Sequence, residues 1–178
     1  MGPRAYGVAV LAAGTILWVL SGTDHEKAVL AAREPEAVRA LEARAVARPS
    51  DPDASRALGQ AYLDARQPGL AIVLVEGAPP VVRSEVRVRH LYARALIDEG
   101  RNDEALAVER GVVAACEPIA EGGHAADGCD AVLLASAMRR TEILGQLVAL
   151  GVKDAQAHPE TSLVAYQNAT REARVMVQ

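Results

Sequence analysis

The two cysteines are the residues of this sequence with the most distinctive chemistry. Cys116 and Cys129 are the only cysteines, and the stretch EPIAEGGHAADGCD that follows Cys116 predicts a loop over residues 117–130. In an oxidising compartment such a pair favours a disulfide, and closing a loop of this size contributes about 3 kcal/mol to the free energy of unfolding. We therefore predict a Cys116–Cys129 disulfide that staples the loop.

Two other hypotheses use the same residues for metal binding or for redox chemistry. His124 and Asp130 would complete a Cys-His-Cys-Asp set, but its spacing, C-x7-H-x4-C-D, matches no common zinc pattern. Redox-active dithiols usually lie closer together, as C-x-x-C. The sequence contains neither a phosphate-binding G-x-x-x-x-G-K-[ST] loop nor a recognisable nucleophile motif. We predict no cofactor, no metal and no enzymatic activity, with a redox or metal-dependent enzyme using Cys116, His124 and Cys129 as the less favoured alternative.

The helices that must position such residues are predicted from a pattern that occurs twice in the sequence. Bulky and small side chains recur at a constant separation, which we call the repeat offset and which predicts stacked helical hairpins. The composition is dominated by Ala, Val and Leu, with no Phe and one Trp, which favours an all-α fold of closely packed helices. Small residues are expected where the two helices of each hairpin cross, with bulky residues beside them. The pairs matched at the repeat offset are Leu58 and Tyr92, Gly59 and Ala93, Tyr62 and Leu96, and Ala71 and Ala105.

This small–large pattern resembles the tetratricopeptide repeat (TPR) family. Gly100 stands at the family's inter-helix turn and is followed by RNDEAL, a typical opening of the second helix. In the first repeat Arg66 occupies the place of the turn glycine, and in the second Glu109 occupies a position that is usually bulky and apolar. The resemblance implies a TPR-like solenoid of about two to three hairpins that binds other proteins. Its clear repeats span residues 52–83 and 84–117, and capping helices over 131–178 close the stack.

The resemblance also places one polar stripe of the leading helices in the inner groove of the stack. The residues of this predicted groove are Arg56, Gln60, Arg87, His90 and Arg94. Guanidinium groups bind carboxylates through paired hydrogen bonds, so the groove suits an acidic segment of a partner. The family's carboxylate-clamp members carry Lys and Asn at such positions, which argues against chaperone-tail recognition. The alternative is an ordinary solvated face, because seventeen arginines against two lysines reflect composition as well as function.

The beginning of the chain is apolar. Residues 6–20 read YGVAVLAAGTILWVL, and the uncharged run extends to Thr23. A membrane-spanning helix needs about 20 such residues, so residues 1–22 are predicted to form a transmembrane anchor that contacts the membrane through residues 5–22. Arg4 precedes the run and acidic residues follow it, which places the amino terminus inside. A cleaved signal peptide and a buried core helix are the alternatives.

The remaining domain is then exported. Residues 23–34 are predicted to form a stalk and residues 35–178 a TPR-like helical domain in the periplasm or outside. The net charge of −4 and the absence of a basic run interleaved with aromatic residues argue against nucleic-acid binding. The sequence therefore predicts a single-pass inner-membrane protein that holds other proteins as a scaffold, assembly factor or accessory subunit of an envelope complex. The alternative is a structural subunit of a large membrane assembly.

Overall fold

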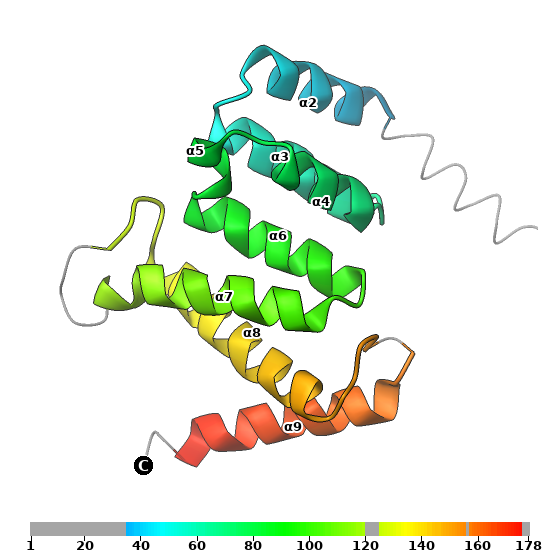
Figure 1. Cartoon of the computed structure of the whole chain (residues 1–178), viewed down its shortest axis with the longest axis vertical. Coiled ribbons are helices and arrows are strands. Elements are labelled where there is room, and N and C mark those ends of the chain that lie inside the picture. Colours follow the sequence, from blue (N-terminus) through cyan, green and yellow to red (C-terminus); the bar gives the residue numbers. More distant parts are fainter. Residues whose placement is uncertain (1–34, 120–124, 156, 176–178) are drawn as a thin grey trace, which may run out of the picture. The chain divides into compact units, whose positions relative to one another are not determined.

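The described part of the protein is built from helices joined by short connections (Figure 1). The structure is a computed structural model that describes residues 35–119, 125–155 and 157–175. No strand occurs in these ranges, which confirms the all-α prediction. The helices are α2 (Pro35–Ala47), α3 (Pro52–Asp64), α4 (Pro68–Glu76), α5 (Pro80–Arg83), α6 (Val86–Asp98), α7 (Asn102–Cys116), the 3-10 turn η1 (Glu117–Ile119), α8 (Ala131–Ala149) and α9 (Pro159–Val175).

The chain divides into two units, Met1–Ala40 and Leu41–Gln178. The second unit contains α3 to α9 and the end of α2, whereas only residues 35–40 of the first unit are described. The predicted anchor, residues 1–22, and the predicted stalk, residues 23–34, lie outside the described residues. Within the described ranges, no helix is long and apolar enough to cross a membrane.

Within the second unit, consecutive helices pack as antiparallel pairs. The pairs are α3 with α4, α6 with α7, and α8 with α9, and each later pair packs on the one before it through α4·α6 and α7·α8 contacts (Figure 1). The predicted capping segment, residues 131–178, thus includes a third helix pair with the same arrangement. We call α3, α6 and α8 the leading helices, because each begins a pair.

The turns that end the three leading helices share one hydrogen-bond pattern. Arg66, Gly100 and Gly151 have left-handed φ values of 56°, 73° and 69°. The N–H of the next residue donates back to a carbonyl five residues earlier, as in the Gln67–Tyr62 and Arg101–Leu96 bonds of 2.8 Å. This is the glycine-favouring helix end in which a left-handed residue lets the chain reverse. Arg66 adopts a conformation that costs an L-residue with a side chain roughly 1–2 kcal/mol.

The predicted small residues lie at the tightest points of the packing. Ala71, Ala93 and Ala105 are fully buried. A Cβ atom on Gly59 would lie 2.8 Å from Cδ2 of Leu91, so Gly59 allows α3 to approach the leading helix of the next pair. The closest crossing at Gly59 is therefore between two pairs, whereas the sequence pattern placed it within one. Only the packed structure distinguishes these two contacts, because both place a small residue against a neighbouring helix.

Two tyrosines tie leading helices to earlier helices, α3 to α2 and α6 to α4. The Tyr62 hydroxyl donates to Glu42 at 2.9 Å, and the Tyr92 hydroxyl donates to Glu76 at 2.8 Å. Burial, together with the hydrogen bond to the carboxylate, raises the pKa of Tyr62 to about 12. The same two causes raise the pKa of Tyr92 to about 12. A neutral tyrosine is the hydrogen-bond donor in both links.

Candidate functional site

A cavity of about 380 Å³ lies along the leading helices and contains every residue of the predicted groove. We call it the groove cavity. Helices α3 and α6 contribute the five predicted residues, and the loop before α8 and the first half of α8 complete the wall. The lining residues are Arg56, Gln60, Arg87, His90, Leu91, Arg94, Asp130, Val132, Leu133, Ser136 and Arg140.

The α8 wall is the part of the site that sequence reasoning missed. The sequence suggested Asp130 only as a metal ligand, and it did not single out Ser136 or Arg140. A signal was present, because Ser136 and Arg140 are four residues apart on a helix, as are His90 and Arg94. Such pairs share one face. Ser136 and Arg140 were missed because the loop closed by the disulfide precedes α8, so α8 does not follow α6 at the repeat offset.

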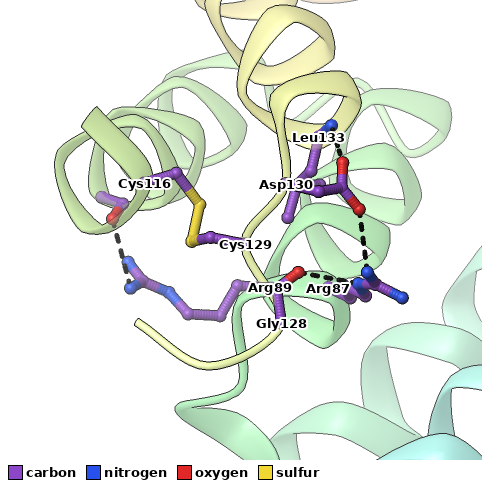
Figure 2. Close-up of a disulfide and its surroundings, with 8 residues drawn as sticks. Arg87, Arg89, Cys116, Gly128, Cys129, Asp130 and Leu133 are labelled. Atoms are coloured by element: carbon purple, nitrogen blue, oxygen red, sulfur yellow. Dashed lines mark hydrogen bonds and ion pairs between the residues drawn. A yellow bond between two sulfur atoms is a disulfide. The ribbon is translucent and has the colours of Figure 1, made fainter. Parts of the chain in front are cut away.

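Asp130 precedes α8, and each of its two carboxylate oxygens makes a contact that positions the start of this helix. Its Oδ1 accepts the Leu133 N–H at 2.7 Å and so caps the helix, while its Oδ2 pairs with Arg87 at 2.8 Å (Figure 2). Arg87 also donates from Nε to the Gly128 carbonyl at 2.8 Å. The helix-capping hydrogen bond, followed by the charge of Arg87, lowers the pKa of Asp130. The charge of Arg87 is therefore matched within the protein.

A buried ionic network lies behind the cavity. Glu109 is 0% exposed, and its two oxygens contact Arg140 Nη1 at 2.6 Å and His90 Nδ1 at 2.9 Å. Arg140 Nη1 also donates to the His90 carbonyl at 2.9 Å, and His90 Nε2 lies 3.1 Å from the Ser136 hydroxyl. A buried carboxylate requires such partners, since its desolvation would otherwise cost several kcal/mol. The unexpected Glu109 therefore joins α7 to α6 and α8.

Ser136, His90 and Glu109 follow the order of a nucleophile, base and acid, but their setting does not suit acyl transfer. Arg140 also binds the carboxylate of Glu109, so this carboxylate does not serve His90 alone. Ser136 lies inside α8, where backbone N–H groups are used by the helix and cannot form an oxyanion hole. The contacts hold His90, Ser136 and Arg140 in place at the cavity wall.

Two arginines of the cavity keep their charge available. Arg94 is exposed and makes no hydrogen bond or ion pair with any described residue. Arg56 pairs only with Asp53, at 3.3 Å, and both side chains are exposed to solvent. Arg140 uses Nη1 for all its contacts, which leaves its other nitrogens for a ligand. An anion entering the groove cavity can therefore meet three guanidinium groups.

A second cavity, of about 500 Å³, adjoins the first at Arg94. Its wall includes Asp64 and Asp98, which end α3 and α6 and are separated by the repeat offset. Asp64 accepts a hydrogen bond from Gln60 at 2.7 Å. Arg66 and Arg94 line the same cavity, so its charge is mixed.

The predicted disulfide is present in the structure. Cys116 ends α7 and is bonded to Cys129, with a Cα–Cα distance of 5.4 Å (Figure 2). The bond lies one residue from Asp130, so it holds the loop end that caps α8 and pairs with Arg87. Both sulfur atoms are bonded to each other and neither is available as a thiolate ligand. Among the described residues no cluster of three or more His, Cys, Asp or Glu side chains could hold a metal, and His124 lies outside them.

No protein-family model, curated protein or solved structure matches this chain. The chemistry of the site must therefore be inferred from its own residues. Asp130 and Glu109 match the charges of Arg87 and Arg140, so the excess positive charge of the groove cavity comes from Arg56 and Arg94, on a chain whose net charge is −4. A concave surface with this charge attracts and holds anionic groups.

Proposed function

We propose that the protein is a membrane-anchored protein–protein interaction module whose groove cavity holds an acidic segment of a partner. The partner belongs to a membrane or envelope complex, and the protein acts there as a scaffold, assembly factor or accessory subunit. One observation carries this proposal: five residues chosen from two sequence repeats line a single cavity, and Arg94 within it has no partner in the described structure.

A TPR-like solenoid is the form that we propose for the domain. The support is local and repeated. Arg66 and Gly100 are separated by the repeat offset, adopt the same left-handed conformation and close equivalent helix pairs. The packing order of the pairs is that of a stack in which each pair contacts its neighbours. In such stacks the leading helices line one continuous surface.

The energy of binding depends on how well the groove cavity shields a charged contact from water. A hydrogen bond between a guanidinium group and a carboxylate contributes about 1.5–3 kcal/mol when it is partly shielded, and close to nothing on an open surface. The arginines stand on helices, so little order has to be created on binding. The network around Glu109 adds to this, because it holds Arg140 before a ligand arrives.

We propose that residues 1–22 anchor the protein in the inner membrane, with the amino terminus inside and the helical domain in the periplasm or outside. The Cys116–Cys129 disulfide supports export, because disulfides persist in oxidising compartments. The full chain should fractionate with membranes and resist carbonate extraction, with protease reaching the domain only from outside. Recovery of a soluble protein lacking about its first 20 residues would favour a cleaved signal.

The groove is tested by reversing charge at its two most available arginines. Arg56→Glu with Arg94→Glu should abolish most partner recovery in a crosslinking pull-down from membranes. The melting temperature should hardly change, because both side chains are exposed. A matched control is Arg83→Glu with Arg139→Glu, two exposed arginines that line neither cavity. If the groove variant keeps every co-purifying partner, the arginine row is only a solvated face.

A further inference from the structure

The groove cavity has two ends of different chemistry. Helices α6 and α8 begin side by side, where Arg87 pairs with Asp130. At this end the charges cancel, and Val132 presents an apolar side chain that is 79% exposed. Leu91 and Leu133 lie in the same wall. At the start of α6 and α8 the cavity wall therefore combines a paired charge with apolar side chains, and Arg56 of α3 lines the same cavity.

The other end of the cavity is positive. Arg94 lies two turns further along α6 than Arg87, and Arg140 lies about two turns further along α8 than Val132. Arg94 has no partner among the described residues, and Arg140 offers the nitrogens that Glu109 does not occupy. Beyond Arg94 lies the second cavity, where Asp64 and Asp98 stand beside Arg66 and the charge is mixed. The unpaired positive charge of this end therefore lies at Arg94.

The distance between the two ends limits which ligand can reach both. Seven residues separate Arg87 from Arg94 and eight separate Val132 from Arg140, which corresponds to roughly 10–12 Å along a helix. An extended peptide covers this distance in three to four residues, at about 3.3 Å each. Its side chains alternate between two faces, so two of them face the groove together only at an even separation. Four residues satisfies both conditions.

We propose that the groove cavity recognises an extended acidic segment in which an aliphatic residue lies four positions from the acidic group. The acidic group binds at Arg94 and Arg140, and the aliphatic side chain packs on Val132, Leu91 and Leu133. The arginines select the acidic group of the segment by charge. Burial of the exposed Val132 surface selects its aliphatic side chain. The proposal rests on the proposed function and adds a motif to it.

Two peptides of identical composition test the spacing. Glu-Glu-Ser-Gly-Ser-Leu carries the leucine four positions from the second glutamate, whereas Glu-Glu-Leu-Ser-Gly-Ser carries it next to that glutamate. Both carry the same fluorophore on the amino terminus and an amidated carboxyl terminus, and binding to the full chain is measured by fluorescence anisotropy at low salt. The first peptide should bind about tenfold more tightly, as expected for one buried aliphatic side chain. Equal affinities of the two peptides would overturn the motif.

Protein variants separate this motif from the groove itself. Val132→Ser should bring the two peptides to the same affinity, and Val73→Ser should keep the tenfold difference, because Val73 is 66% exposed on α4 and lies outside both cavities. Arg56→Glu with Arg94→Glu should weaken both peptides together. Failure of both peptides to bind the native chain would count against the proposed function itself. A spacing preference that survives Val132→Ser would count against the aliphatic site alone.

Discussion

The first and second helix pairs share their turns and their small residues, yet they differ at one position of the core. Val75 of α4 and Glu109 of α7 are equivalent by the repeat offset, and both are buried. Val75 packs in an apolar cluster, whereas Glu109 contacts His90 and Arg140. The difference shows that the repeat specifies where a side chain lies, and that its neighbours decide whether the position can hold a charge.

The trailing helices of the two pairs also end differently. Helix α4 has 9 residues and stops at Gly77, whereas α7 has 15 residues and runs to the disulfide at Cys116. The longer helix brings the stapled loop back to α6, where Gly128 and Asp130 hold Arg87. The second pair therefore carries both the ionic network and the end of the groove cavity, while the first contributes Arg56 and Gln60.

The largest effect on the free energy of unfolding is expected when the buried glutamate of the second helix pair is replaced by the valine of the first. Glu109→Val should lower the free energy of unfolding by about 4 kcal/mol, because Arg140 loses its carboxylate in a partly buried site. Denaturant unfolding of the full chain measures the change. Adding Arg140→Met should restore most of the loss, since an apolar pair can replace an ion pair of similar volume. A single Glu109→Val variant as stable as the native protein would show that the network adds nothing.

The next effect concerns the disulfide, which only the second pair has. Cys116→Ser with Cys129→Ser should cost about 3 kcal/mol, the loop-closure entropy for a separation of 13 residues. Hydrogen exchange should quicken most at the start of α8, whose cap Asp130 follows the bond, while α3 and α4 stay formed. Two free thiols on alkylation of natively exported, non-reduced protein would contradict the bond.

A smaller effect is expected at the turns. Arg66→Gly should raise the free energy of unfolding by about 0.5–1 kcal/mol, because glycine adopts the left-handed conformation freely and the gain is reduced by its greater freedom when unfolded. Gly100→Ala is the opposite change at the equivalent turn and should destabilise. Its Cβ would also lie 3.1 Å from the Lys153 carbonyl oxygen. If both substitutions destabilise equally, the two turns do not share one conformational requirement.

The smallest effect on stability is expected at high pH, where the tyrosine hydroxyls that link the helices ionise. Tyr62 and Tyr92 ionise less readily when folded, since their pKa values are raised from 10.0 to about 12. Their contribution to stability is therefore complete below pH 10 and is lost as the pH rises towards 12. Tyr62→Phe with Tyr92→Phe should lose less stability than the native chain over this range. Parallel curves for the two proteins would show that the raised pKa values make no difference to folding.

Much of the architecture could be predicted because it depends on neighbours along the chain. The helix starts at Pro52 and Pro68, the turn at Gly100 and the burial of Ala71 follow from local capping, backbone freedom and periodicity. The site could be predicted only in part. The groove residues of α3 and α6 came from the repeat, whereas Ser136 and Arg140 stand beyond a loop that breaks its spacing.

The sequence by itself determined the helical class, the paired helices and the disulfide, since two cysteines allow one intramolecular bond and the helix pairs depend on short-range patterns. The tertiary structure alone decided the charge of the groove cavity. Arg87 and Asp130 are 43 residues apart, and Arg140 and Glu109 are 31 apart. Which arginine is neutralised and which stays available depends on how the helices pack, because an ion pair forms only when packing brings both side chains within a few ångströms.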